Sequence, residues 1–355
     1  MIKISATFLI AVLSVIAHHQ CLSADLLGNI DKWVDPSVRQ DEKLKESVMK
    51  VIADQKPTKV PLEQPAPTLL VKDQDKGLSF PPIAALEMLQ EVANLYQKSQ
   101  ERVAIVDLGC GLGYTSVLLL LAGGKVDAVE KSLPAAKEAN KYIYSNTRNI
   151  LNYRVAEARQ YYSVIHEDIV KENQTQWTTR PHKIAVCNAV LHFLTPDQCD
   201  LLARRVFDNL VEGGKAYISA DSPYFNALWV KSYLNKKSKG RLYPGYSIHS
   251  RKIMSATHAT ADHKPRKVKG GRVPGWSYFG YYLGKNAVTD LENSFHIVKN
   301  LFMVDDLAAI FTRAGFKIEK CYYIDVKGQI VQPLDVEVGN HYRGCIVVKK
   351  VSPSL

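Results

Sequence analysis

Short apolar runs alternate with helix-like stretches through the middle of this sequence. Runs of about six apolar, often β-branched residues are typical of buried strands, and the first such run is Val103–Leu108. Similar runs lie within 125–130, 161–170, 183–194 and 215–220. Apolar residues at helical spacing precede the first run, from about Ile83 to Lys98, and a helix is also expected over Asp41–Asp54. Strands that alternate with helices predict an α/β fold.

The first predicted strand leads directly into a glycine-rich turn. Gly109, Gly111 and Gly113 alternate with other residues, and a buried helix is expected to continue through Val117–Leu121. Glycine reaches positive φ without strain, and its missing Cβ lets a ligand lie against the backbone. Strand, glycine turn and helix together predict the first unit of a nucleotide-binding sheet.

The spacing of the glycines bears on which nucleotide is bound. A dinucleotide fingerprint has a small residue three positions after its second glycine, but that position holds the bulky Tyr114. Asp107 precedes the first glycine by two residues. The pattern therefore counts against NAD, although a glycine loop alone does not specify a ligand.

Acidic residues close the next two predicted strands. Glu130 ends the second strand, where a carboxylate can accept hydrogen bonds from the two hydroxyl groups of a ribose. NAD-binding folds share this feature. The third strand ends in Glu167–Asp168, followed by Ile169.

The fourth and fifth predicted strands carry two further patterns. The exit of the fourth strand reads N-x-x-x-H, from Asn188 to His192. The stretch 210–212 is expected to end a helix, and Gly213–Gly214 is expected to form a turn before a fifth strand at 215–220.

Taken in order, these motifs resemble those of the class I S-adenosylmethionine-dependent methyltransferases. The D-x-G-x-G-x-G stretch 107–113, the two acids, the N-x-x-x-H exit and the L-x-x-G-G stretch 210–214 occur in the family's order. The sequence Ala314-Gly315-Phe316 resembles the family's closing turn. The resemblance implies a seven-stranded Rossmann-like sheet with flanking helices. Its last two strands, at 317–324 and 342–349, would form an antiparallel pair.

The resemblance also implies the cofactor and the residues that hold it. The cofactor would be S-adenosyl-L-methionine, with no metal ion. The cofactor-binding residues would be Asp107, Gly109, Cys110, Gly111, Gly113, Glu130, Asp168, Ile169 and Asn188, and the catalytic candidates would be Asn188 and His192.

Individual roles follow from the same resemblance. Asp107 would bind the cofactor's ammonium group, directly or through water, and Glu130 would bind the ribose. Asp168 would accept a hydrogen bond from the adenine amino group, with Ile169 packed on the ring. Asn188 would lie where the acceptor meets the methyl group, and His192 in the same place is a candidate general base.

The N-terminus has the layout of a secretory signal peptide. Lys3 provides a positive charge, an apolar run covers Ile4–Ala17, and small residues end the segment at Ala24. We therefore expect residues 1–24 to direct export or secretion, with an uncleaved membrane anchor as the alternative. Residues 25–75 would form an N-terminal helix and a proline-rich linker, and residues 76–355 the methyltransferase domain.

A basic, aromatic-rich insertion, 223–300, follows the fifth predicted strand. Between Lys231 and Arg272 twelve lysines and arginines face a single acid, Asp262, which gives +11. The formal net charge of the whole chain is also +11, so the excess charge is local to this stretch. Such a stretch can bind an anionic partner (nucleic acid, a membrane surface or an acidic protein), and it can equally be a solvated loop.

Three functions remain open at the level of sequence. The leading hypothesis is methyl transfer from S-adenosylmethionine to an unidentified acceptor. The alternatives are a non-enzymatic binding module that uses the basic insertion and an NAD-dependent oxidoreductase. Five cysteines remain beyond the signal segment, without the spacing of a metal site, and we expect them to be buried free thiols.

Overall fold

A computed structural model describes most of the chain from Leu26 onward. The described residues are 26–55, 58–61, 76–79, 85–171, 177–178, 180–191, 194, 196–225, 227–238, 302–325, 329–338 and 342–351. The expected signal peptide, most of the expected linker and the larger part of the basic insertion, 239–300, lie outside these residues. Among the described helices none is long and apolar enough to cross a bilayer.

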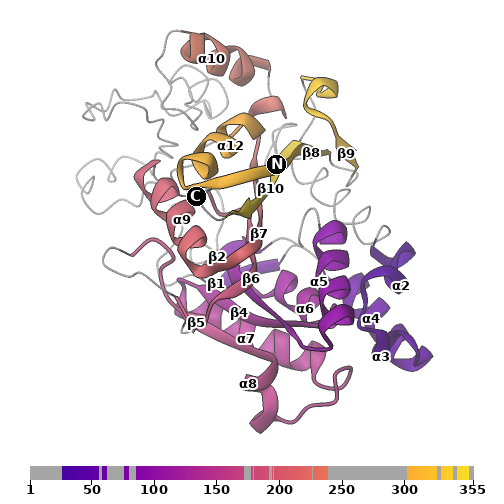
Figure 1. Cartoon of the computed structure of the whole chain (residues 1–355). Coiled ribbons are helices and arrows are strands. Elements are labelled where there is room, and N and C mark those ends of the chain that lie inside the picture. Colours follow the sequence, from indigo (N-terminus) through magenta and orange to yellow (C-terminus); the bar gives the residue numbers. More distant parts are fainter. Residues whose placement is uncertain are drawn as a thin grey trace, which may run out of the picture.

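An eight-stranded sheet forms the centre of the molecule (Figure 1). Its order is β5 (Tyr162–His166), β4 (Gly124–Glu130), β3 (Val103–Leu108), β6 (His182–Asn188), β7 (Leu210–Asp221), β10 (Tyr342–Lys350), β8 (Phe316–Asp325) and β9 (Ile330–Val331). The first five strands in this order are parallel, and β10 is antiparallel to both of its neighbours. This confirms the expected α/β Rossmann-like sheet with its final antiparallel pair.

The expected count of seven strands was wrong by one. The additional strand is the two-residue β9, which pairs with the end of β8 through Tyr323 and Ile324. So short a run leaves no periodic pattern in the sequence, so only its pairing reveals it. A separate two-stranded sheet pairs β1 (Thr58–Pro61) with β2 (Lys76–Ser79).

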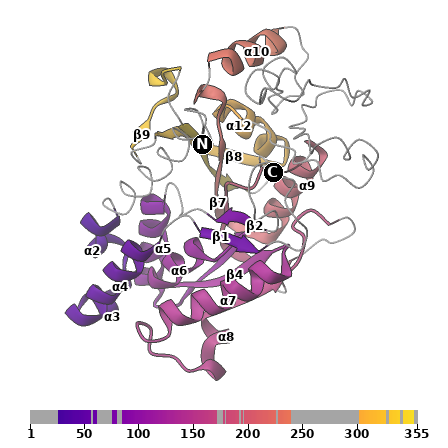
Figure 2. The same ribbon diagram turned by 180° about the vertical axis from the view of Figure 1, so that it is seen from behind.

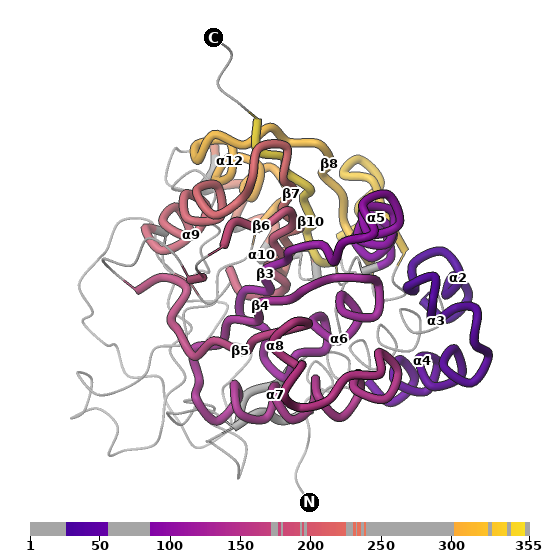
Figure 3. Tube along the Cα trace, turned by 60° about the horizontal axis from the view of Figure 1, so that its bottom comes forward, coloured from indigo at the N-terminus to yellow at the C-terminus, as the bar shows by residue number. Residues whose placement is uncertain are grey.

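Helices cover both faces of the main sheet, as the views from behind and from below show (Figures 2 and 3). One face carries α9 (Pro196–Asn209) and α12 (Val304–Arg313), whose apolar residues pack with Val106, Val129 and Ile346. The helices of the other face are α2 (Ile30–Trp33), α3 (Pro36–Arg39), α4 (Glu42–Asp54), α5 (Ala85–Ser99), α6 (Tyr114–Leu121) and α7 (Leu133–Thr147). The short α8 (Ala158–Tyr161) precedes β5.

The helices before the expected linker pack directly on the core. Trp33 is fully buried, and its indole N–H donates to the carbonyl oxygen of Leu26 at 3.0 Å. The backbone N–H of Asp35 donates to the carbonyl of Leu121 at the end of α6, at 2.8 Å. The segment from Leu26 is thereby part of the same hydrophobic core as the sheet.

Two element boundaries differ from expectation. Residues 210–214 do not end a helix, because β7 already begins at Leu210. The turn expected at Gly213–Gly214 is an irregularity inside β7, where Gly213 has φ +69°. In β6, His182 pairs with Leu210 of β7, but Ile184, two residues later, already pairs with Lys215. At the other side of the sheet, Glu167–Asp168 follow β5 instead of ending it.

Candidate cofactor site

The glycine turn between β3 and α6 has the backbone geometry that requires glycine. Gly109, Gly111 and Gly113 have φ of +72°, +56° and +81°, a region that other residues enter only with strain. A Cβ on Gly109 would lie 2.5 Å from Cγ2 of Val190, and one on Gly113 would lie 2.8 Å from Cγ1 of Ile143. The turn therefore depends on glycine both for its conformation and for its packing.

The turn folds back onto the end of β4. The backbone N–H groups of Gly109 and Cys110 both donate to the carbonyl of Val129, at 2.8 and 3.0 Å. Cys110 is buried, and burial raises the pKa of its thiol well above the usual value, so the side chain is a neutral thiol. In the described part of the chain all five cysteines are free, as expected, and four of them are buried.

Asp107 lies directly beneath the turn, near the end of β3. Its side chain is buried, and Oδ2 accepts a hydrogen bond of 2.6 Å from the hydroxyl of Ser116 in α6. Burial raises the pKa of the Asp107 carboxyl to about 6, although the hydrogen bonds from Ser116 act in the opposite direction. A buried carboxylate gains most from a cationic partner, which is what a ligand's ammonium group would provide.

Glu130 closes β4 and contacts the turn. Its two carboxylate oxygens accept hydrogen bonds from the backbone N–H groups of Gly111, at 3.0 Å, and Ser132, at 2.9 Å. Burial raises the pKa of Glu130, with those N–H groups lowering it in part. A carboxylate can accept about four hydrogen bonds, so this one retains capacity for ribose hydroxyl groups.

Asp168 and Ile169 occupy the connection that leaves β5. Asp168 accepts a hydrogen bond from the backbone N–H of Val170 at 3.0 Å and pairs with Nζ of Lys131 at 2.8 Å. Ile169 is buried on the side of the sheet that carries α9. Its carbonyl accepts hydrogen bonds from Trp177 and Arg205. The contacts of these two residues with adenine stay predictions.

The exit of β6 approaches the glycine turn from the other side. Oδ1 of Asn188 accepts a hydrogen bond of 2.6 Å from the hydroxyl of Ser219 in β7. The backbone N–H of Ala189, a residue with φ +61°, donates to that hydroxyl oxygen at 3.3 Å. Val190 then packs on Gly109. His192, the second catalytic candidate, lies outside the described residues.

The strand register places three of these groups on one face of the sheet. Asp107 pairs with Val186 in β6, and Asn188 two residues later pairs with Ser219. Because alternate residues of a strand share a face, Asp107, Asn188 and Ser219 lie on the same side, near the carboxyl ends of their strands. That edge is where open α/β sheets bind ligands.

Sequence reasoning missed the residues that hold the candidates in place. Ser116 binds Asp107, Ser219 binds Asn188, and Lys131 binds Asp168. Each contact joins residues that only the fold brings together, except for Ser116, which the turn places above Asp107.

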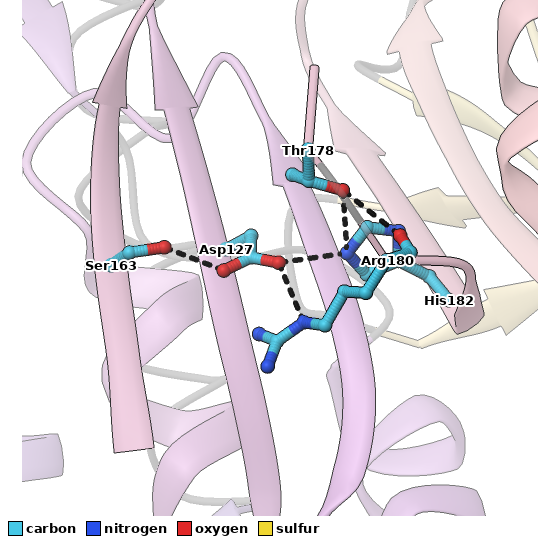
Figure 4. Close-up of polar contacts among 5 residues, drawn as sticks. All are labelled: Asp127, Ser163, Thr178, Arg180 and His182. Carbon is cyan, nitrogen blue, oxygen red and sulfur yellow. Dashed lines mark hydrogen bonds and ion pairs between the residues drawn. The ribbon is translucent and has the colours of Figure 1, made fainter. Parts of the chain in front are cut away.

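A second polar cluster lies on β4, β5 and the start of β6 (Figure 4). Asp127 accepts hydrogen bonds from Ser163 at 2.5 Å and from Nε of Arg180 at 2.8 Å, and Nε2 of His182 lies 2.9 Å from the same carboxylate. The hydroxyl of Thr178 lies 3.5 Å from that same Nε2. A nucleophile and an orienting acid need opposite ring nitrogens, so this cluster is not a catalytic triad. It fixes the connection between β5 and β6, on which Asp168 and Ile169 lie.

Comparison with solved structures finds similar folds among methyltransferases. No protein-family model matches the sequence, and no curated protein matches it. The 1,6-didemethyltoxoflavin-N1-methyltransferase of Burkholderia thailandensis is 13% identical over 76% of this chain and 79% of its own, with a TM-score of 0.41. The magnesium protoporphyrin IX methyltransferase of Synechocystis PCC 6803 is 13% identical over 74% and 82%, with a TM-score of 0.38. An S-adenosylmethionine-dependent methyltransferase of Methanosarcina mazei is 15% identical over 73% and 98%, with a TM-score of 0.40. At this level of similarity, the ligands and substrates of these proteins are not assigned to this chain.

Proposed function

We propose that this chain is an S-adenosylmethionine-dependent methyltransferase. The observation that carries the proposal is the glycine turn with Asp107 beneath it and Glu130 bonded to its Gly111 N–H at 3.0 Å. The turn exposes backbone to a ligand, and the two acids suit an ammonium group and a ribose. An amino acid joined to a nucleoside, as in S-adenosylmethionine, carries both of these polar groups.

The sheet supports this choice over a dinucleotide. In the dinucleotide-binding order a sixth parallel strand follows the fifth, whereas here the antiparallel β10 occupies that place. Tyr114 fills the position where the dinucleotide fingerprint has a small residue. Its ring packs edge-on against Tyr142, with centroids 5.0 Å apart, and is 4% exposed. An oxidoreductase is therefore the less favoured function.

When bound, S-adenosylmethionine supplies an activated methyl group on a sulfonium, so the protein needs to align the reactants and exclude water. The backbone of the turn would hold the methionine part, with Asp107 at its ammonium group. Asn188, fixed by Ser219 and the backbone that follows, would border the place where the acceptor enters. That arrangement would position the nucleophilic atom of the acceptor against the methyl group, so the protein itself need not supply a catalytic nucleophile.

The first helix of the basic insertion supports a role at the acceptor side. In α10 (Ala227–Ser238) the buried Tyr233 donates its hydroxyl to the carboxylate of Asp306 in α12, with oxygen–oxygen distances of 2.6 and 2.7 Å. The backbone N–H of Phe302 donates a hydrogen bond of 2.9 Å to the carbonyl of Asp221 at the end of β7. Asp221 and Phe302, which flank the insertion, are thus bonded to each other at the carboxyl edge of the sheet, and α10 lies beside α12 (Figures 1 and 2). We propose that the insertion shapes the acceptor pocket and meets an anionic partner there.

Calorimetry with the cofactor tests the proposed function. Wild type is expected to bind S-adenosylmethionine, and Glu130→Ala to bind it at least about tenfold more weakly, because hydrogen bonds to a charged group contribute about 1.5–3 kcal/mol each. Gly111→Val is expected to abolish binding, since valine at φ +56° is strained.

Matched controls come from the same chain. Glu138→Ala removes an exposed acid of α7, and Gly28→Val changes a glycine with open space around it. Both are expected to leave binding unchanged. A folded wild type that binds NADH but no S-adenosylmethionine would refute the proposal.

A further inference from the structure

An arginine–aspartate pair lies at the same edge of the sheet, beyond the candidate cofactor site. Arg343 at the start of β10 and Asp221 at the end of β7 are register partners. Nε of Arg343 lies 3.2 Å from Oδ1 of Asp221, and the side chains are 14% and 25% exposed. The backbone beneath them is fixed, because the neighbouring Tyr342 carbonyl accepts a hydrogen bond of 2.8 Å from Ser222.

The ion pair with Asp221 involves Nε of Arg343 and leaves other hydrogen-bond donors of the guanidinium available. Its Nη1 is buried and has no hydrogen-bond partner among the residues that the structure describes. Buried polar atoms are rarely left unpaired, so this donor has capacity for one further acceptor. A guanidinium presents a planar fork of donors that matches a carboxylate.

The register places Arg343 on the same face of the sheet as Asn188, two residues further along the strands. Asn188 pairs with Ser219, Asp221 follows Ser219 by two residues, and Arg343 pairs with Asp221, so all four side chains share one face. From β6 to β10 there are two strand spacings, about 10 Å. β6, which carries Asn188, and β7 therefore lie between β3, which leads into the glycine turn, and β10, which carries Arg343.

We propose that Arg343 binds a carboxylate of the methyl acceptor, with Asp221 orienting the guanidinium. The proposal rests on the proposed function, because it places the acceptor between Arg343 and the methyl group. The class of acceptor is a small carboxylic acid or an acidic side chain of a protein.

The neighbouring aspartate favours a carboxylate over a phosphate. Asp221 already offsets the single positive charge of Arg343, so a doubly charged group would meet repulsion that the site does not compensate. A singly charged, planar carboxylate meets less repulsion and can accept two parallel N–H bonds. This balance also predicts effects of opposite sign for the two residues.

Binding of simple carboxylates tests the proposal on the full-length chain saturated with S-adenosylhomocysteine. Acetate, benzoate and propionate are compared with their neutral amides by saturation-transfer NMR and calorimetry. Wild type is expected to bind at least one carboxylate about tenfold more tightly than its amide. Arg343→Gln is expected to lose this preference, and Arg343→Lys, which keeps the charge but not the fork, to reduce it.

Asp221→Asn is expected to raise carboxylate affinity several-fold, because it removes the competing negative charge. Arg313→Gln removes an arginine from a surface ion pair with Asp200 and is expected to change nothing. A purely structural role for the pair would not produce opposite effects from Asp221→Asn and Arg343→Gln.

The outcomes separate this inference from the proposed function. If S-adenosylhomocysteine binds but no carboxylate is preferred over its amide, or if folded Arg343→Gln keeps the preference, the acceptor assignment is wrong and the methyltransferase proposal stands. If S-adenosylhomocysteine does not bind to folded wild type, the proposed function fails instead.

Discussion

At the scale of single residues, the ionisation of Asp107 links the candidate site to pH. The buried carboxyl has its pKa raised to about 6, so the neutral form is favoured at mildly acidic pH. Its contribution to stability is therefore fully present below the ordinary value of 3.8 and is lost as the pH rises through about 6. A bound ammonium group would reverse that preference by pairing with the charged form.

We expect the affinity for S-adenosylmethionine to fall as the pH drops below about 6, by up to about tenfold per pH unit. Calorimetry at several pH values between 5 and 8 measures this. Asp107→Asn is expected to bind more weakly at pH 7.5 and to show a flat profile. An unchanged pH dependence in that variant would assign the titration to another group.

At the scale of the elements, the Asp127 cluster holds the β5–β6 connection against β4. Burial alone would raise the pKa of Asp127, but hydrogen bonds from His182 and Ser163 and the charge of Arg180 hold it below its ordinary value. A carboxyl with a lowered pKa stabilises the fold above its unfolded-state value, and this contribution is lost as the pH falls through the folded-state value.

Asp127→Asn is therefore expected to lower the free energy of unfolding at pH 7 by about 3 kcal/mol, since it leaves buried donors without their charged partner. The loss should shrink as the pH falls below 4. Urea unfolding at pH 7 and at pH 3 measures both. Asp200→Asn, in the more exposed pair with Arg313, is the control and should cost less than about 1 kcal/mol. Equal losses in the two variants would contradict an anchoring role.

The elements also show what the sequence could and could not reveal. β3, the glycine turn and α5 were predicted closely, because apolar periodicity and glycine spacing are local signals. The irregularity in β7 was misread because Gly213–Gly214 is an equally good signal for a turn between elements. The bond between Ser219 and Asn188 joins positions 31 residues apart, and no local pattern could have indicated it.

At the scale of the whole molecule, the N-terminal helices are part of the domain that carries the candidate site. Trp33 is among the largest fully buried side chains, and the backbone of Asp35 is bonded to the end of α6. α6 in turn begins at the glycine turn. The N-terminal helices therefore contact the end of α6, the helix whose other end adjoins the glycine turn. Loss of their packing is expected to displace this helix and with it the turn.

We expect Trp33→Ala to destabilise the whole chain by about 3–5 kcal/mol, the usual cost of removing a fully buried aromatic side chain. Thermal unfolding measured by circular dichroism should show one lowered transition. Leu334→Ala, at a residue that is 98% exposed, should leave the transition in place. Two separate transitions in Trp33→Ala would mean that the N-terminal helices unfold independently.

The place of β10 in the sheet has a consequence for the order in which the protein becomes functional during synthesis. β10 follows all the other described strands in the sequence, yet it lies between β7 and β8. The strands around the glycine turn are synthesised well before β10, whereas β8 cannot join the sheet until β10 has left the ribosome. Since β10 also supplies Arg343, we expect a nascent chain, or one shortened before β10, to form the proposed cofactor site first and the proposed carboxylate site last.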